Sequence, residues 1–281
     1  MIKLDLTMRA KKKYQINLSV FSAAIFLTTL LCSLNTVQLS FAQEVGDDSN
    51  TWVIGIDMPT PRTEVTAANI GDSIYVLGGF TSDSEITDIV EMFNVTSNSW
   101  NKDIDPLPIP LHHAVANSYQ NKIFVIGGYT GDWIPSNKLF IYDPITNGWT
   151  ESNPMPTPRG SPNANFVNGT LYVIGGDLDD NAISVVEKYN VDTGQWTASL
   201  APMPTPRHHA ASAVVDGNIY VMGGRISGEM INVDLIEKYD PLLDKWSIDL
   251  EPMPSKRSGV VATSLNESIY ALGGEQIQGT F

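Results

Sequence analysis

The segment Ile74-Tyr75-Val76-Leu77-Gly78-Gly79 decides the fold, because near copies of it recur along the chain. Each copy is a short apolar run that ends in a glycine doublet, and the doublets are Gly78-Gly79, Gly127-Gly128, Gly175-Gly176, Gly223-Gly224 and Gly273-Gly274. Successive doublets lie 49, 48, 48 and 50 residues apart. A short apolar run that ends at glycine predicts a buried strand. The chain is therefore predicted to consist of repeats of about 50 residues.

A second signal keeps step with the doublets, because an aromatic residue is followed seven positions later by tryptophan in four repeats. The pairs are Phe93 and Trp100, Tyr142 and Trp149, Tyr189 and Trp196, and Tyr239 and Trp246. The residues between them form turns, as in Asp143-Pro144-Ile145-Thr146-Asn147-Gly148. Each pair therefore predicts a β-hairpin.

The third signal is a proline-rich segment that ends in arginine, 16 residues before the doublet. The arginines are Arg62, Arg159, Arg207 and Arg257, and Leu111 takes this position in the second repeat. Together the three signals resemble the kelch repeat, and the resemblance covers about residues 52 to 274.

The resemblance implies an all-β fold, a β-propeller with four antiparallel strands in each blade. Strand a follows the arginine position, strand b runs into the doublet, strand c ends at the aromatic residue and strand d holds the tryptophan. We expect complete blades at about 62–104, 111–153, 159–200 and 207–250, and a partial fifth at 257–281 that a strand at 51–56, around Trp52, would close. Because kelch rings commonly have more blades than this, we expect a truncated product, with a five-blade ring as the alternative.

Residues 1–42 differ in composition from the rest of the chain. Five basic residues precede an apolar stretch from about Ile16 to Leu34, and Ser40-Phe41-Ala42 offers small residues at a cleavage site. This pattern predicts a signal peptide that is cleaved after Ala42, and hence a secreted or cell-surface protein. An uncleaved membrane anchor is the alternative. The propeller domain is then 43–281, and it has no cysteine because Cys32 leaves with the signal.

The predicted mature chain is strongly acidic, with 12 Lys and Arg against 30 Asp and Glu, a net charge of −18. Such a surface repels phosphate backbones, which excludes nucleic acid as the expected partner. The expected partners are a protein, a peptide or a glycan, and a membrane only if the N-terminal segment remains attached.

Strand alternation places the d–a and b–c connections on one face, where the loops vary in sequence, and variable loops on a fixed scaffold carry binding specificity. The ligand-binding residues predicted there are Arg62, Arg159, Arg207 and Arg257 around the channel mouth, with Tyr129, Trp133, Asp177, Asp179 and Arg225 above them. The arginines have a structural alternative, because residues that recur in every repeat usually serve stacking. Their partners would then be Glu91, Glu187 and Glu237.

We predict neither a metal nor a cofactor. The histidines form the pairs His112-His113 and His208-His209, and adjacent strand residues point to opposite faces, in blades that are not neighbours. The acids Asp177, Asp179 and Asp180 lack the spacing of a calcium loop. Glycosylation sequons at Asn94, Asn168 and Asn266 fall on the opposite face.

The sequence favours a binding module over an enzyme, because no acid, base and nucleophile set is unique to one repeat and no catalytic residue is assigned. Galactose oxidase resembles this chain in its kelch propeller, but its copper chemistry needs a cysteine that the mature chain lacks. Exported sialic acid mutarotases are also kelch propellers. A sugar-processing enzyme of that kind, with arginines that hold a sugar carboxylate, is therefore the alternative function.

Overall fold

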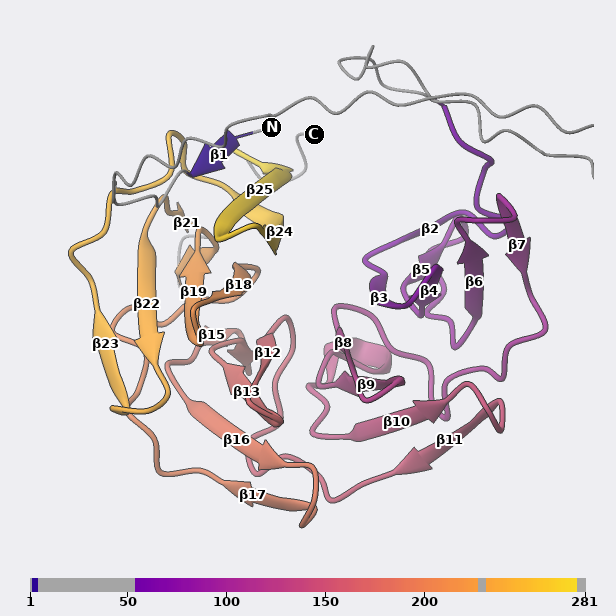
Figure 1. The fold of residues 1–281 in the computed structure, drawn as a ribbon, viewed down its shortest axis with the longest axis horizontal. Helices are drawn as coiled ribbons and strands as arrows, with labels where there is room; N and C mark the ends of the chain where they lie inside the picture. The colour runs from indigo at the N-terminus through magenta and orange to yellow at the C-terminus, as the bar shows by residue number, and fades with distance from the viewer. Residues whose placement is uncertain (1, 5–53, 227–230, 277–281) are drawn as a thin grey trace, which may run out of the picture. The chain divides into compact units, whose positions relative to one another are not determined.

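The computed structural model describes residues 2–4, 54–226 and 231–276. The strands form four-stranded antiparallel sheets in which the order across the sheet is the order along the chain. Residues 62–275 therefore fold into successive propeller blades, as the repeat predicts (Figure 1).

The four complete blades have closely matched bounds. The first is β3 (Thr66–Ile70), β4 (Ser73–Leu77), β6 (Val90–Asn94) and β7 (Ser99–Asn101), and the second is β8 (Val115–Tyr119), β9 (Lys122–Ile126), β10 (Leu139–Asp143) and β11 (Gly148–Glu151). The third is β12 (Asn163–Val167), β13 (Thr170–Ile174), β16 (Val186–Asn190) and β17 (Gln195–Thr197), and the fourth is β18 (Ala211–Val215), β19 (Asn218–Met222), β22 (Ile236–Asp240) and β23 (Lys245–Ser247).

The fifth blade contains β24 (Ser258–Leu265) and β25 (Ser268–Glu275), which pair as strands a and b. Strand β1 (Ile2–Leu4) pairs antiparallel with β25, at the position that strand c occupies in the other blades. The predicted closing strand around Trp52 lies largely outside the described residues, and residues 54–56 form no strand. The predicted signal peptide also lies outside them, apart from residues 2–4.

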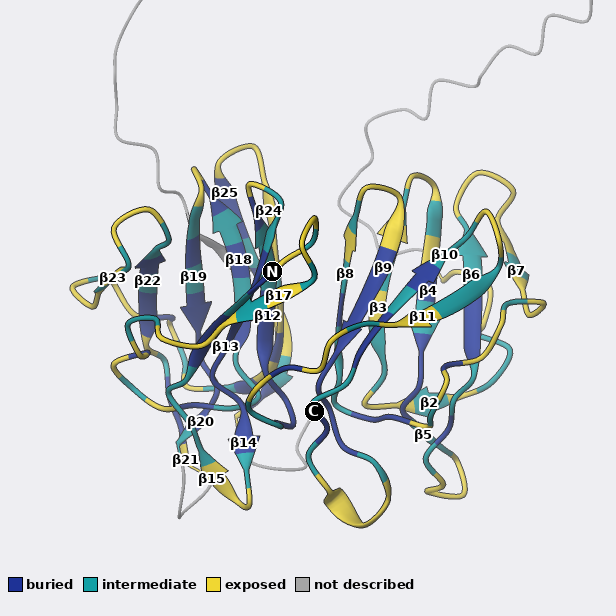
Figure 2. Ribbon diagram, turned by 90° about the horizontal axis from the view of Figure 1, so that it is seen from below, coloured by how far each residue is buried: buried dark blue, intermediate teal, exposed yellow. Residues whose placement is uncertain are grey.

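Among the described residues, three short two-stranded antiparallel ladders lie on one face of the blades. They are β2 (Arg62–Thr63) with β5 (Phe80–Thr81), β14 (Asp177–Leu178) with β15 (Asn181–Ala182), and β20 (Arg225–Ile226) with β21 (Ile231–Asn232). The β2–β5 ladder joins the segment before strand a to the residues after the doublet, and the second blade has the equivalent bridge from His112 to Tyr129. The other two ladders lie within b–c loops, and the b–c loop of the second blade holds a 3₁₀ turn, Gly131–Trp133. Figure 2 shows these elements together at one edge of the molecule, which we call the loop face.

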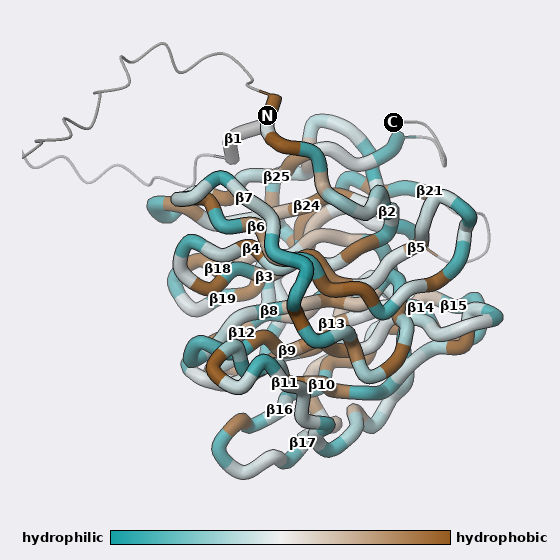
Figure 3. Tube along the Cα trace, turned by 90° about the vertical axis from the view of Figure 1, so that its right-hand side faces the viewer, coloured by the Kyte–Doolittle hydropathy of each residue, from teal (hydrophilic) through white to brown (hydrophobic). Residues whose placement is uncertain are grey.

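Hydrophobic side chains are buried between blades rather than inside any one sheet. The cluster between the first two blades joins Tyr75 and Leu77 to Ile123 and Tyr142, all at most 5% exposed. Figure 3 shows hydrophobic stretches recurring along the strands, while many of the connecting turns are hydrophilic. Each repeat therefore needs its neighbour to bury its apolar surface, as in other repeat proteins.

The glycine doublets form the seams between blades. Gly175 has φ +63°, and a Cβ there would lie 2.7 Å from the backbone oxygen of Arg207 in the next blade. The amide of Gly176 donates to that same oxygen at 2.9 Å. The equivalent bonds from Gly79, Gly128 and Gly224 reach Leu111, Arg159 and Arg257 at 2.8, 3.0 and 2.9 Å. Only glycine combines this conformation with this close approach.

The tryptophan of strand d also ties neighbouring segments together. Trp149 packs on Tyr142 with ring centroids 5.1 Å apart, and its indole N–H donates to the Asp105 carbonyl at 3.0 Å. Trp196 and Trp246 repeat both contacts: each packs on the tyrosine of its own blade, and each donates to a carbonyl in the segment that precedes the blade. The aromatic pairs thus fix the outer hairpin and the linker that leads into each blade. Within the described residues, no helical segment has the length and hydropathy of a transmembrane helix.

Candidate functional site

The repeated arginines lie inside the blades. Arg159 is 0% exposed, and its Nη2 donates to Glu187 Oε2 at 2.6 Å. Its Nη1 donates to the carbonyls of Gly175 and Val185, at 3.0 and 2.9 Å. Burial lowers the pKa of Arg159 to about 10, and the Glu187 carboxylate opposes this shift. The guanidinium therefore links strands b and c of its own blade.

The other arginine positions follow the same plan with two exceptions. Arg62 pairs with Glu91 at 3.0 Å and Arg207 with Glu237 at 2.7 Å, so the glutamate partners expected from the sequence are confirmed. Leu111 fills the position in the second blade as a buried apolar side chain, 1% exposed. Arg257 donates to the Gly273 carbonyl and to Ser255 Oγ. The sequence placed these arginines around the channel mouth as ligand contacts, but three of the four guanidinium groups are enclosed by their own blade and present no surface to a ligand.

The centre of the loop face is built two residues further along each repeat. Every one of these five positions has a left-handed backbone, with φ between +46° and +60°: Glu64, His113, Ser161, His209 and Gly259. We call this set the mouth ring. Backbone bonds connect its members, from the His113 amide to Glu64 O at 3.2 Å and from the Ser161 amide to His113 O at 3.0 Å. Four non-glycine residues hold a conformation that costs roughly 1 to 2 kcal/mol each, and such strain clusters at functional sites.

Side chains of the mouth ring meet one another. Glu64 Oε2 lies 3.2 Å from His113 Nε2, and Ser161 Oγ lies 3.3 Å from His209 Nε2. The rings of His113 and His209 are in contact, with centroids 4.9 Å apart. Residues from the first four blades thus converge at the centre of the loop face.

The histidine pairs require a correction. The sequence analysis assumed that adjacent residues point to opposite faces and that the second and fourth blades stay apart. In the structure, Nδ1 of His112 lies 2.7 Å from Nδ1 of His113, and the His208–His209 pair repeats this contact at 2.5 Å. The left-handed backbone turns both rings of each pair toward each other, and the mouth ring brings the two blades into contact.

A second set of residues follows the doublets directly and surrounds the mouth ring: Phe80, Tyr129, Asp177, Arg225 and Glu275. Tyr129 donates its hydroxyl to Asp177 Oδ2 at 2.8 Å, which joins the second blade to the third. Arg225 forms an ion pair with Glu275, and its Nε donates to Ser258 Oγ at 2.8 Å, which joins the fourth blade to the fifth.

Aromatic rings cover one side of the mouth. The Trp133 ring lies 4.7 Å from His112, 5.2 Å from Tyr129 and 6.1 Å from Phe80, measured between centroids. We call these four residues the aromatic platform. Trp133 remains 58% exposed, whereas Tyr129 is 4% and His112 1% exposed. The platform therefore presents one large aromatic side chain to solvent on a buried base.

Burial sets the charges at the mouth. It lowers the pKa of His113 to about 3, that of His209 to about 2 and that of His112 to about 4. These imidazoles are therefore neutral near pH 7. Burial also raises the pKa of Glu64, and Arg225 opposes that shift. The mouth ring combines neutral imidazoles with the partly exposed carboxylate of Glu64.

The structure brings several predicted ligand-binding residues together. Tyr129, Trp133, Asp177 and Arg225 all lie at or beside the mouth, while Asp179 is an exposed residue at the β14–β15 turn. The sequence reasoning missed Glu64, Phe80, His113, Ser161 and His209 as a group. Their signal was positional, because they occupy the second position after the arginine or the first position after the doublet. Among the described residues, no group of three or more His, Cys, Asp or Glu side chains is arranged to hold a metal ion.

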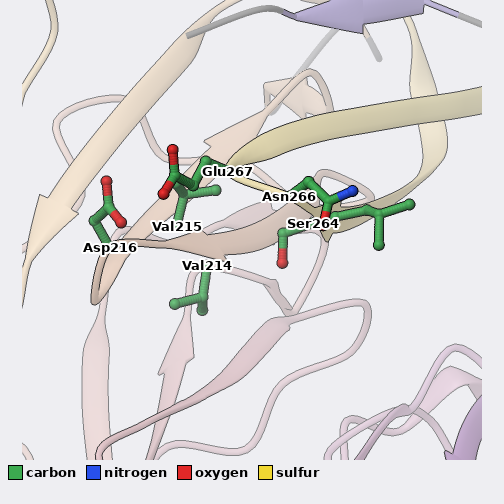
Figure 4. A pocket seen from close by; sticks show the side chains of 7 residues that line it. Val214, Val215, Asp216, Ser264, Asn266 and Glu267 are labelled. Atoms are coloured by element: carbon green, nitrogen blue, oxygen red, sulfur yellow. The ribbon is translucent and has the colours of Figure 1, made fainter. Parts of the chain in front are cut away.

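The face opposite the mouth is lined by turns that join strands a to b and c to d. A shallow hollow of about 160 Å³ there lies between the turns of the fourth and fifth blades, with Asp216, Asn266 and Glu267 along its rim (Figure 4). Asn266 and Asn168 are exposed in such turns and Asn94 ends β6, so the three sequons share this face. Their glycosylation stays a prediction.

Comparison with known proteins agrees with the repeat. Residues 65–274 match the family model described as the KLHDC2/KLHL20/DRC7 Kelch-repeats domain. Kelch-like protein terF of Aspergillus terreus is 33% identical over 154 residues, which cover 49% of this chain and 33% of that protein. Kelch repeat and BTB domain-containing protein 12 of Danio rerio is 31% identical over 154 residues, 48% of this chain and 25% of that protein. The chain spans a third or less of these curated relatives.

A solved structure, titled "Structure of YjhT", superposes with a TM-score of 0.72 at 18% sequence identity and covers 82% of each chain. At this identity the likeness supports the fold alone. Because the family model matches most of the chain and the blades carry the repeat signature in three dimensions, the chain belongs to the kelch-repeat β-propeller family.

Proposed function

We propose that this chain is an exported kelch-repeat binding module that recognises a protein, peptide or glycan on its loop face. The observation that carries the proposal is Trp133, which is 58% exposed over a buried aromatic base. Tryptophan is enriched among the residues that dominate binding energies, because a large rigid ring buries much area at low entropic cost.

The surroundings of Trp133 support recognition rather than packing. Trp133 belongs to one repeat only, and its b–c loop holds a 3₁₀ turn where the b–c loops of blades three and four hold the ladders β14–β15 and β20–β21. Both Asp132 and Trp133 have positive φ, +57° and +56°. The loop thus holds a strained conformation that leaves the indole on the surface above the mouth ring.

The test is a peptide and glycan array probed with the full chain and with two variants of adjacent residues. Trp133→Ala removes the indole, and Ile134→Ala removes a neighbour of the same exposure, 58%, that has no ring. We expect Trp133→Ala to abolish array binding and Ile134→Ala to retain it, with equal melting temperatures. Equal binding by both variants would refute a site at Trp133.

A sugar-processing enzyme is the second candidate, and the contact between Glu64 and His113 favours it. A carboxyl group with a raised pKa beside a neutral imidazole is a plausible proton shuttle. Against it, three of the four arginines that would hold a sugar carboxylate are buried and paired with glutamate. The assay is the rate at which the anomers of a sialic acid interconvert, followed by NMR with wild type and Glu64→Gln. A rate equal to the uncatalysed one excludes this candidate.

A further inference from the structure

The balance of charge at the mouth is negative. Glu64, Asp177 and Glu275 contribute carboxylates, and Arg225 contributes one cation, which pairs with Glu275. The mouth histidines add no positive charge near pH 7, because burial keeps them neutral. Two carboxylates of the mouth therefore remain without a basic side chain in an ion pair.

The loops around the mouth extend this charge outward. Asp132, Asp179 and Asp180 are exposed at their tips. In the described parts of the loops 80–88, 129–138, 177–184 and 225–234, the basic residues are Arg225 and Lys138, and Lys138 pairs with Glu151 at 2.6 Å. A ligand that approaches this face thus meets an anionic surface, which attracts cations and repels anions.

The aromatic platform gives the same indication independently. A tryptophan face binds an ammonium or guanidinium group more strongly than other aromatic rings do. The ring of Trp133 and the carboxylate of Glu64 contact the same imidazole, His113, at a ring centroid distance of 5.4 Å and an Nε2–Oε2 distance of 3.2 Å. The Trp133 ring and the Glu64 carboxylate therefore flank the same imidazole.

A buried polar atom of the platform is also left unsatisfied. His112 is 1% exposed, and its Nε2 has no hydrogen-bond partner. Its ring meets Trp133 edge-on, with centroids 4.7 Å apart and an interplanar angle of 84°. A buried nitrogen without a partner costs free energy, so packing of the platform alone does not account for the imidazole at this position.

We propose that the mouth receives an arginine or lysine side chain from a basic segment of a protein partner, held between the Trp133 face and the Glu64 carboxylate. This inference rests on the proposed binding function and narrows it from any protein, peptide or glycan to a cationic peptide. It differs from the anionic sugar ligand of the alternative enzyme, since three of the four arginines that would hold a carboxylate are internal to the blades.

The experiment is a calorimetric titration of the full chain with two peptides, acetyl-Gly-Gly-Arg-Gly-Gly-amide and its citrulline analogue. Citrulline keeps the shape of arginine and removes its charge. We expect the arginine peptide to bind at least about tenfold more tightly, and Trp133→Ala and Glu64→Gln each to weaken it about fivefold or more. Melting curves check that both variants are folded.

Two further variants are the matched controls. Ile134→Ala lies beside Trp133 with the same exposure, and Glu85→Gln removes an exposed acid from the same face. Both are expected to bind within about twofold of wild type, whereas a loss with Glu85→Gln equal to that with Glu64→Gln would indicate diffuse attraction and overturn the proposal.

The outcomes separate this inference from the function on which it rests. If the citrulline peptide binds as tightly, or if Trp133→Ala leaves arginine-peptide binding unchanged, the cationic site is refuted. Array binding that depends on Trp133 would then still support the loop-face function. If neither the array nor the peptides bind to the folded chain, both proposals fail.

Discussion

The arginine position and the mouth ring are two residues apart in the sequence, but the first keeps its side chain in most blades and the second changes it from blade to blade. Arg62, Arg159 and Arg207 keep the same side chain, the same glutamate partner and nearly complete burial. The mouth ring keeps the same backbone conformation in every blade but changes its side chain each time, from Glu to His, Ser, His and Gly. The repeat therefore fixes the backbone throughout and leaves the chemistry free at one position, and that position faces the centre of the loop face.

The largest expected loss of stability comes from breaking one of the buried arginine–glutamate pairs. Glu187→Ala leaves the buried guanidinium of Arg159 without its partner, and we expect it to lower the free energy of unfolding by about 3 to 5 kcal/mol. The control is Lys138→Ala, which removes an ion pair of the same length, 2.6 Å, between groups that are 42% and 49% exposed. Its effect should stay below about 1 kcal/mol in urea denaturation. Equal losses of unfolding free energy would show that the buried arginine–glutamate pairs do not stabilise the blades more than an exposed ion pair does.

Acidification tests the mouth instead. The pKa values of His113 and His209 are lowered by burial to about 3 and about 2, so below their ordinary value of 6.5 the unfolded chain binds more protons than the folded one. Stability is complete above pH 6.5 and falls as the pH drops toward these folded values, by about 2 kcal/mol for each histidine at pH 5. Denaturation at pH 7 and pH 5 measures this loss.

The matched variant for that experiment is His113→Gln with His209→Gln. It should lose less stability than wild type between pH 7 and pH 5, because the two titrating groups are gone. An unchanged pH dependence would mean that the mouth histidines are not held neutral by burial.

The same substitution can be made at a tryptophan of a strand d hairpin and at the tryptophan of the aromatic platform. Trp149 packs on Tyr142 and donates to the Asp105 carbonyl, whereas Trp133 is 58% exposed. We expect Trp149→Ala to cost at least about 2 kcal/mol of unfolding free energy and Trp133→Ala no more than about 1. Array binding should show the reverse order. If Trp133→Ala proves the more destabilising, Trp133 serves packing and the case for a binding surface weakens.

The smallest expected effect concerns Glu64. Burial raises its pKa, so the folded chain holds a proton there more tightly than the unfolded chain does, and ionisation at neutral pH opposes folding. Glu64→Gln should therefore leave stability unchanged or slightly raise it at pH 7, and the difference should shrink as the pH falls. Thermal melts at pH 7 and pH 4 measure it. A clear destabilisation at pH 7 would assign Glu64 a structural role.

The blades were predictable because their determinants are local and repeated. The doublets, the hairpin aromatics and the arginine–glutamate spacing place strands a to d in each repeat, and the structure agrees. The closing strand of the fifth blade was not predictable, since pairing between distant segments leaves no periodic signal. The structure pairs β1 with β25 at the strand c position, for which the sequence offered no candidate, and the predicted strand d around Trp52 lies largely outside the described residues.

The site was harder to read than the fold. Tyr129, Trp133, Asp177 and Arg225 were found because they stand in variable loops. The histidine pairs were set aside because alternation was assumed, and the left-handed φ of +51° at His113 and His209 breaks it. A left-handed φ is expected at glycine, and because these residues are histidines, nothing in the sequence indicated it. The convergence of non-neighbouring blades is a property of the assembled structure, not of any one repeat.

The bond from the second glycine of the first four doublets joins a main-chain amide to a main-chain carbonyl of the next blade, as Gly79 does with Leu111 and Gly176 with Arg207. This bond involves main-chain atoms only, so it does not depend on the side chain of the residue whose carbonyl accepts it. The seam therefore tolerates a change of the residue whose carbonyl accepts, as Leu111 shows in place of arginine, whereas mouth side chains that contact another blade need a matching change there. For protein engineering, the seams can be kept constant across blades, while a mouth residue has to be exchanged together with its contact in another blade.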